Sequence, residues 1–238
     1  PPCAYLIIQK HSPRVVIGCR DPFAKVNGLG IKKLLDAGCE VQVGVLEAEC
    51  LDLNRRFIIF HTQKRPHITL KWAQSQDHYI DRKRECAHTC ARESAVRLSD
   101  HRTTQICHRR RAEHDAIMVG WRTAVMDNPS LTTRLWPGNN PLRVVLDRDG
   151  SLQAMTSADG KSLNLYSDNQ AETLALATTS PAEILKALYD RGVQSVLIEG
   201  GAATLQSFID ADLWDAAYVE TSPQLLHDGV AAPVLTTS

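Results

Sequence analysis

The sequence predicts an α/β fold, because short apolar runs alternate with segments of helical periodicity. Runs of β-branched and aliphatic residues at 15–17, 116–119 and 195–198 have the length of buried strands. Apolar residues in 30–37 and 181–191 recur every three or four positions, as they do on one face of a helix. Strands that alternate with helices in this way are typical of an α/β sheet.

The N-terminal region gives its elements in the order strand, helix, strand, helix. Gly38 is placed to end the helix over 30–37, because glycine adopts the left-handed conformation of a helix C-terminus without strain. Valines alternate with other residues over 41–45, which predicts a strand. Helical periodicity resumes over 47–60.

A domain boundary is predicted where the polar segment 61–66 ends in a proline. We therefore divide the chain into domains 1–62 and 63–238. Further strands are expected at 68–73, 116–119, 142–146, 163–166, 195–198 and 216–219, and helices at 103–112, 181–191 and 202–211.

The first strand of the second domain has two different faces. Ile68, Leu70 and Trp72 share one side because side chains alternate along a strand. Lys71 and Ala73 share the other side. Lys71 therefore points away from the apolar side of its own strand.

Composition excludes several classes of protein. The 238 residues carry 27 Lys and Arg against 27 Asp and Glu, so the whole chain has no bias toward nucleic acid or an anionic membrane surface. No apolar run approaches the roughly 20 residues of a membrane span, and no secretory leader is recognisable. The seven cysteines are odd in number and scattered, which predicts reduced thiols and a cytoplasmic protein.

Charge is nevertheless uneven along the chain. Residues 82–111 include nine Lys and Arg against three acids, which favours an anion-binding region, although a solvated helix face would give the same run. Three consecutive arginines at 109–111 also suggest an RNA-binding module. The zero net charge and the lack of a neighbouring set of stacking aromatic residues argue against that alternative.

A glycine pair follows the apolar strand 195–198. Gly200 and Gly201 come between Glu199 and a predicted helix. Glycines let a ligand approach the backbone closely, and the free amides of a helix N-terminus attract phosphate. The pattern fits a diphosphate-binding turn, and an ordinary turn is the alternative.

Metal chemistry is not favoured by the spacing of the histidines and cysteines. Cys86, His88 and Cys90 match no common structural zinc pattern, so we interpret them as part of an exposed loop. A zinc-dependent base deaminase needs Glu two residues after a metal-binding His. None of the nine histidines has one.

Four segments together resemble the bifunctional riboflavin-biosynthesis deaminase/reductase family. They are Thr-Leu-Lys-Trp-Ala-Gln-Ser-Gln-Asp at 69–77, Ala-Glu-His-Asp-Ala-Ile-Met-Val-Gly at 112–120, Asp-Asn-Pro-Ser-Leu-Thr at 127–132 and Ile-Glu-Gly-Gly at 198–201. Nearly the whole chain is covered. The resemblance implies an N-terminal zinc deaminase of cytidine-deaminase-like α/β fold, followed by an NADPH-dependent pyrimidine reductase of dihydrofolate-reductase-like fold.

The same resemblance makes residues 1–62 the C-terminal remnant of the deaminase domain. The opening Pro-Pro-Cys resembles the last zinc-ligand motif of that domain, so Cys3 matches one metal ligand. The other ligands and the His-x-Glu motif would lie upstream. We expect zinc only in an intact deaminase domain, and we expect no bound zinc here.

The resemblance also implies site residues. Those that would bind NADPH are Ala73, Thr123, Asp127, Gly201, Ala202, Ala203, Thr204, Leu205, Gln206 and Ser207. Those that would contact the substrate are Arg111, Leu131, Arg134 and Glu199, with the two arginines suited to gripping a phosphate. Our candidates for orienting or protonating the sugar are Lys71, Asp127 and Glu199, and which of them transfers the proton is left open.

These implications give a specific expected activity. It is the NADPH-dependent reduction of 5-amino-6-(5-phosphoribosylamino)uracil, a small-molecule substrate, to its ribitylamino product. We expect no nucleic-acid or membrane partner and a homo-oligomeric enzyme. The alternative is a catalytically inactive fragment that acts as an assembly or nucleotide-binding module. Two departures from the family pattern bear on activity: His78 in place of a glycine, where a side chain is expected to crowd the nicotinamide, and an apparent insertion at 86–93.

Overall fold

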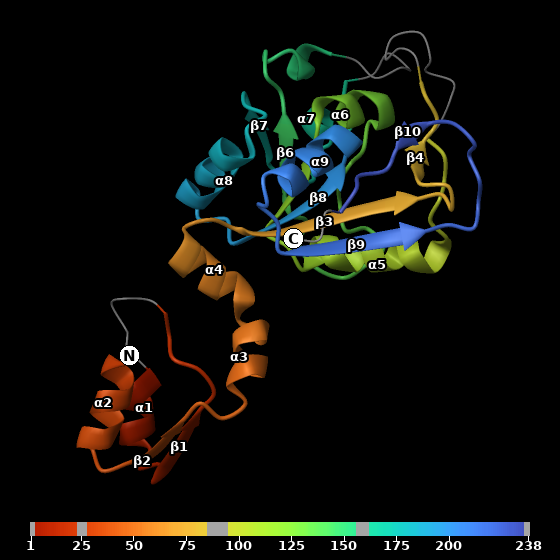
Figure 1. Ribbon diagram of the computed structural model, residues 1–238. Coiled ribbons are helices and arrows are strands. Elements are labelled where there is room, and N and C mark those ends of the chain that lie inside the picture. The colour runs from red at the N-terminus through yellow and green to blue at the C-terminus, as the bar shows by residue number, and fades with distance from the viewer. Residues whose placement is uncertain (1–2, 23–27, 85–94, 156–161, 236–238) are drawn as a thin grey trace. The chain divides into compact units, whose positions relative to one another are not determined.

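The computed structural model describes residues 3–22, 28–84, 95–155 and 162–235. Two compact units make up the chain, Pro1–Arg65 and Pro66–Ser238 (Figure 1). The division falls inside the polar segment 61–66. The cysteine-containing segment 86–90 and the apparent insertion 86–93 lie outside the described residues.

The first unit contains one small parallel sheet. Its elements are α1 (Cys3–Gln9), β1 (Arg14–Ile17), α2 (Leu29–Asp36), β2 (Glu40–Val43), α3 (Glu47–Leu53) and α4 (Arg55–Gln63). Strand β1 pairs with β2 from Arg14 opposite Glu40 to Ile17 opposite Val43. The helix expected over 47–60 is interrupted at Asn54, whose side-chain amide donates to the Cys50 carbonyl at 2.8 Å. A side chain that bonds the backbone in this way competes with continued helix.

The second unit is built on a six-stranded sheet with the order β7-β6-β5-β8-β3-β9, and every neighbouring pair is parallel. The strands of this sheet are β3 (His67–Gln74), β5 (Ala116–Val119), β6 (Leu142–Leu146), β7 (Thr173–Leu176), β8 (Ser195–Gly200) and β9 (Ala216–Thr221). The helices are α5 (His101–Ala112), α6 (Trp121–Asp127), α7 (Asn164–Ser167), α8 (Pro181–Asp190) and α9 (Ala202–Asp210), with a 3-10 turn at Leu152–Ala154. Two short strands, β4 (Tyr79–Asp81) and β10 (Val230–Ala231), form a separate antiparallel pair.

Each face of the large sheet has its own core. On one face, Ile68, Leu70 and Ile198 pack with residues of α8 and α9 such as Leu188 and Phe208. On the other face, side chains of β5 and β6 pack with α6, α7 and the 3-10 turn. Both faces of the sheet are therefore covered, as in an α/β protein. No helix in the described part of the chain is long and apolar enough to cross a membrane.

The expected strand at 163–166 is wrong, because this segment begins the short helix α7. Leu163 and Leu165 are both buried in the second core, and their alternation imitates a strand. Asn164 decides the local conformation: its backbone amide donates to Asn128 Oδ1 and its side-chain amide donates to the Asn128 carbonyl, both at 2.7 Å. Strand β7, which the sequence reading did not identify, takes the edge of the sheet beside β6.

Candidate active site

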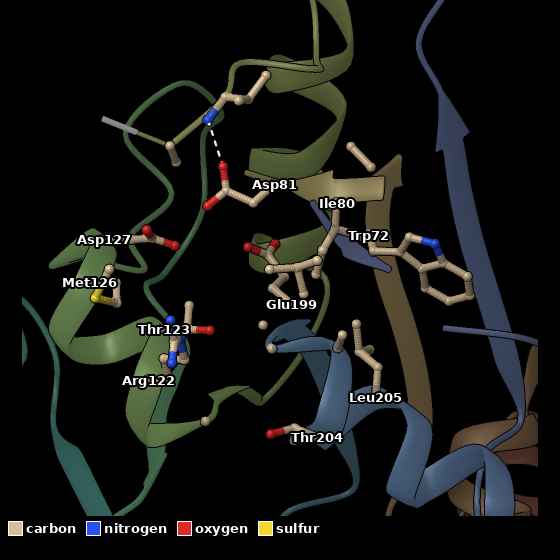
Figure 2. Close-up of a pocket in the computed structure, with 18 of the residues that line it drawn as sticks. Trp72, Ile80, Asp81, Arg122, Thr123, Met126, Asp127, Glu199, Thr204 and Leu205 are labelled. Atoms are coloured by element: carbon tan, nitrogen blue, oxygen red, sulfur yellow. Dashed lines mark hydrogen bonds between the residues drawn. The ribbon is translucent and has the colours of Figure 1, made fainter. Parts of the chain in front are cut away.

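A cavity of about 720 Å³ lies in the second unit, where strands β3, β5 and β8 end and helices α6 and α9 begin. The carboxyl ends of parallel strands are the usual ligand site of open α/β sheets. Figure 2 shows the carboxylates of Asp81, Asp127 and Glu199 grouped toward one end, with Thr204 toward the other. The residues that line it include Lys71, Ala73, Thr123, Asp127, Glu199 and Gly201–Leu205.

Glu199 reaches this cavity because of an irregularity in β8. Along the ladder with β5, Met118 lies opposite Ile198 and Val119 lies opposite Gly200, so Glu199 has no partner on β5. An extra residue of this kind is a β-bulge, which re-aims a side chain. The bulge places a carboxylate between an apolar strand and a glycine turn.

Arg111 on α5 holds the Glu199 carboxylate with two hydrogen bonds. Arg111 Nε donates to Oε1 at 3.1 Å and Nη2 donates to Oε2 at 2.6 Å. The side chains are only 14% and 9% exposed. Burial alone would raise the pKa of Glu199, but Arg111, with a smaller effect from Lys71, lowers it below its ordinary value. Glu199 is therefore a fixed anion.

Asp127, at the end of α6, has the opposite electrostatic behaviour. Its Oδ1 accepts from Arg84 Nη2 at 2.6 Å. Burial raises the pKa of Asp127, while the ion pair with Arg84 acts in the other direction. Two carboxyl groups of one cavity thus have pKa values moved apart, a pattern that separates a proton carrier from a permanent charge.

The end of β8 lies close against the Thr123 side chain of α6 at the cavity. A Cβ on Gly200 would lie 2.8 Å from Thr123 Cγ2, so only glycine fits there. Gly201 has a φ of +83°, and a Cβ on it would lie 3.4 Å from the hydroxyl oxygens of both Thr123 and Thr204. Helix α9 begins at the next residue, Ala202, with its first amides free. Two hydroxyls and a helix N-terminus surround the space above Gly201, and this donor set suits phosphate.

The loop after α6 is held by two buried arginines through its carbonyl groups. Arg143 Nη1 donates to the Ser130 carbonyl at 3.4 Å, and Arg111 Nη1 donates to the Thr132 carbonyl at 3.1 Å. Leu131, between these two carbonyls, is buried and has a φ of +51°. A leucine in the left-handed region is strained, and the surrounding contacts keep it there.

The arginine run 109–111 has a separate internal partner for each residue. Arg109 Nε donates to Glu113 at 2.7 Å, and the Arg110 guanidinium lies 3.3 Å from the centre of the Tyr218 ring. Arg111 binds Glu199 as described above. Each guanidinium is therefore used within the fold.

Comparison with known families gives one match to the second unit. The RibD C-terminal domain family matches residues 66–236. The chain belongs to this family. The resemblance drawn from the four sequence segments is thereby confirmed, and so are the α/β class and the reductase-like fold of the second unit.

Relatives of this RibD-domain chain extend the match into the first unit. The riboflavin biosynthesis protein RibD of Aquifex aeolicus is 30% identical over 246 residues, covering 97% of this chain and 67% of that protein. The protein of the same name from Mycobacterium tuberculosis strain H37Rv is 34% identical over 239 residues, covering 98% of this chain and 64% of that protein. The chain thus spans about two thirds of the length of these curated relatives.

A solved structure gives the same picture. The diaminohydroxyphosphoribosylaminopyrimidine deaminase/5-amino-6-(5-phosphoribosylamino)uracil reductase of Thermotoga maritima is 34% identical to this chain. The TM-score is 0.78, and the match covers 97% of this chain and 65% of that structure.

The site residues expected from the sequence and from the family resemblance fall into two groups. Lys71, Ala73, Thr123, Asp127, Glu199 and Gly201–Leu205 line the cavity. Arg111, Leu131, Arg134, Gln206 and Ser207 do not line it. Arg111 reaches the cavity only through Glu199, Arg134 is exposed with a 3.4 Å bond to Thr132 Oγ1, and Gln206 Nε2 donates to Asp210 at 2.7 Å.

His78, which was expected to crowd the nicotinamide, does not line the cavity. Its φ of +63° is one that a glycine would adopt freely, and its Nδ1 lies 3.0 Å from Gln74 Nε2. The preceding Asp77 accepts hydrogen bonds from Ser75 and from the amides of Leu226 and His227. These bonds, that from Ser75 first, lower the pKa of Asp77 to about 2. The Ser-x-Asp motif is therefore a turn that anchors the C-terminal segment.

Sequence reasoning missed several residues at or beside the cavity, including Asp81, Arg84 and His108. Asp81 and Arg84 line it, and neither belongs to a motif segment. His108 is buried beside Arg111, and burial together with Arg111 and Arg134 lowers its pKa, so its ring is neutral. The charged run Asp-Arg-Lys-Arg at 81–84 was visible in the sequence, but nothing in the sequence pointed to a partner on α6.

The first unit provides no metal centre among its described residues. Cys3 lies exposed at the start of α1 and lines a smaller cavity of about 360 Å³. Throughout the described ranges, no group of three or more His, Cys, Asp or Glu is arranged to hold a metal ion. A zinc role for Cys3 stays an expectation that applies to an intact deaminase domain.

Proposed function

We propose that this chain reduces 5-amino-6-(5-phosphoribosylamino)uracil to its ribitylamino product with NADPH. Family membership over 66–236 supports a reductase, and the printed name of the Thermotoga maritima relative supplies the substrate. The observation that carries the proposal is the convergence of Lys71, Asp127 and Glu199 on one cavity with the Gly201 helix start. The family match does not favour the alternative of an inactive module.

NADPH fits the donor set of the cavity. The hydroxyls of Thr123 and Thr204 and the first amides of α9 would hold its diphosphate above Gly201. When bound, this cofactor supplies a hydride to carbon 1′ of the opened sugar. A volume of about 720 Å³ is within the range of small-molecule sites, and the chain positions the two reactants against each other.

Asp127 and Glu199 take different roles in this proposal. Opening of the ribose to an imine requires a proton at the ring oxygen. Asp127, whose pKa is raised by burial, is the better donor of that proton. Glu199 stays ionised beside Arg111 and accepts hydrogen bonds from substrate N–H or O–H groups. Lys71, on the strand face toward the cavity, balances the charge of Glu199 and orients the sugar.

Arg134 is the stronger candidate for the substrate phosphate. Its guanidinium is exposed and makes one long bond, to Thr132 Oγ1 at 3.4 Å. The guanidinium of Arg111 is committed to Glu199 and Thr132. We therefore propose that Arg111 positions Glu199, while Arg134 pairs with phosphate. The expected homo-oligomer stays a prediction.

The test is loss of reduced-nicotinamide absorbance on mixing the purified chain with NADPH and the phosphorylated aminouracil. Gly201→Val is the matched variant, because a branched side chain at a φ of +83° would be strained and would fill the space between Thr123 and Thr204. We expect at least a tenfold loss of NADPH affinity in a folded Gly201→Val protein. NADPH binding to the wild type without any oxidation would favour the inactive module instead. Unchanged affinity in the folded variant would remove the cofactor site from Gly201.

A further inference from the structure

A partly buried ion triad at the cavity joins Asp127 to two residues that lie outside the family motifs, Asp81 and Arg84. Arg84, just after β4, is only 9% exposed. Its Nη2 lies 2.5 Å from Asp81 Oδ2 and 2.6 Å from Asp127 Oδ1. One guanidinium nitrogen therefore joins a carboxylate of β4 to a carboxylate of α6.

Further contacts fix the triad from both sides. Arg84 Nη1 donates to the Met126 carbonyl at 3.3 Å, and the Arg84 carbonyl accepts from Arg122 Nη2 at 2.6 Å. Asp81 Oδ1 accepts a hydrogen bond from the backbone amide of Val96 at 3.0 Å. Both the guanidinium and the backbone carbonyl of Arg84 are therefore hydrogen-bonded to α6. An exposed ion pair on the surface has no such set of fixed contacts.

We propose that Arg84 and Asp81 form a positioning pair that holds the Asp127 carboxyl group toward the cavity and sets its charge. The inference rests on the proposed function only for the role of Asp127 in the reaction. The geometry of the triad is independent of it. Arg84 donates to Asp127 and is itself shared with Asp81, so the two partners act on Asp127 with opposite signs.

The electrostatics of the triad supports these opposite effects of Arg84 and Asp81 on Asp127. Burial opposes the charge of Arg84, but its ion pairs with Asp127 and Asp81 raise its pKa above the ordinary value, so it stays a cation. Around Asp127, Arg84 lowers the pKa of the carboxyl group and Asp81 raises it. The charged groups that line the same cavity are Lys71 from β3, Asp81 from β4, Arg82 and Arg84 after it, Arg97 before α5, Arg122 from α6 and Glu199 from β8.

The direct test is the titration of Asp127, followed by NMR of isotope-labelled aspartate carboxyl groups and assigned with Asp127→Asn. Arg84→Met should raise the pKa of Asp127 by about one to three pH units, because an adjacent opposite charge is lost. Asp81→Asn should lower it, since Arg84 is then left to Asp127 alone. Arg84→Lys should return it most of the way to the wild-type value.

Lys83→Met is the matched control. It removes a positive charge next to Arg84 in sequence, but Lys83 is exposed and pairs with Asp228. The pKa of Asp127 should not move in this variant. If Arg84→Met and Asp81→Asn shift the pKa in the same direction, or if neither shifts it, the inference is wrong. Should Arg84→Met fail to fold, Asp81→Asn alone decides, because an unchanged or higher pKa contradicts the proposal.

Kinetics gives a second readout. With Asp127 as proton donor, the rate falls as pH rises through its pKa, so the descending limb of the kcat profile should move to higher pH in Arg84→Met and to lower pH in Asp81→Asn. The KM for NADPH should change little, since Figure 2 shows Asp81 and Asp127 toward the other end of the cavity from Thr204. If no variant or wild-type protein oxidises NADPH while the NMR shifts occur as expected, the proposed reaction fails and the positioning pair stands.

Discussion

The two units of the chain differ in what they bury. Among the described residues of the first unit, Ala4 and Leu34 are the buried apolar side chains, whereas Leu46 and Leu53 are 66% and 84% exposed. The second unit buries apolar side chains on both faces of its sheet. Since apolar burial is the main favourable term in folding, the second unit carries most of the stability.

Ion pairs follow the same division. Arg14 and Glu40 of the first unit pair at 3.5 Å with side chains 58% and 71% exposed. In the second unit, the pairs Arg111 with Glu199 and Arg84 with Asp81 have side chains no more than 14% exposed. A closed core can hold charges away from water only when they are paired, and such charges have perturbed pKa values. Among the described residues, the enclosed ion pairs therefore lie in the unit with the larger core, while exposed pairs occur in both units.

The largest expected effect is on stability. Phe208→Ala should lower the free energy of unfolding of the second unit by about 3 to 5 kcal/mol, because Phe208 is fully buried in the core. Leu34→Ala should change it by less than about 0.5 kcal/mol. Denaturant unfolding followed by tryptophan fluorescence measures this unit alone, since all four tryptophans lie after residue 66. Equal shifts in the two variants would refute the comparison.

A comparable effect is expected from breaking the buried ion pair. Arg111→Met should destabilise the second unit by about 3 to 5 kcal/mol at neutral pH, since Glu199 would be left as an unpaired buried charge. The pKa of Glu199 is lowered in the folded protein, mainly by Arg111 and against the effect of burial. The ion pair therefore stabilises the fold at pH values above 4.5, the ordinary pKa of glutamate, and this contribution is lost as pH falls through the lowered pKa.

The pH dependence provides the check on that prediction. The deficit of Arg111→Met should shrink as pH falls toward and through about 4.5, because burial raises the pKa of Glu199 once Arg111 is gone and a protonated Glu199 needs no cation. Arg14→Met is the matched exposed pair and should cost less than about 1 kcal/mol. A deficit of similar size in both variants, or one that does not change with pH, would mean that burial of the Arg111 pair has been misjudged.

The smallest effect concerns substrate binding. Arg134→Lys should raise the KM for the phosphorylated aminouracil roughly tenfold to a hundredfold, because a point charge replaces a planar fork on phosphate. NADPH affinity should stay the same. Arg14→Lys in the first unit should leave both unchanged.

A substrate without the phosphate separates binding of that group from a general loss of activity. Wild type and Arg134→Lys should perform alike toward it. An equal loss toward both substrates would contradict the phosphate role of Arg134.

Several features of the candidate active site could be predicted from residues that are close together in the sequence. The period of two over 68–73 placed Lys71 on the cavity side, and the strand before Gly200 and Gly201 gave the helix start that suits phosphate. These signals lie within a few residues of one another. The alternating leucines at 163–166 misled for the same reason, because they report burial and not the hydrogen bonds that Asn128 makes with Asn164.

The ion pairs of the site could not be predicted from the sequence, because their partners are far apart in the chain. Arg84 and Asp127 are joined across 43 positions, and Arg111 and Glu199 across 88. No periodicity encodes such pairs. The family pattern gave Arg111 as a substrate contact, but only the folded geometry showed that Glu199 occupies its guanidinium.

The bulge at Glu199 has a consequence for insertions and deletions. Strand β3 pairs with β8 in regular register as far as Leu70 opposite Ile198. On the other side of β8, strand β5 skips Glu199, and its next pair after Ile198 is Val119 opposite Gly200. Removing Glu199 would let β5 and β8 pair without interruption and would bring Gly200 to the position of the carboxylate. A single-codon deletion of Glu199 would therefore leave the sheet formed and remove the anion from the cavity.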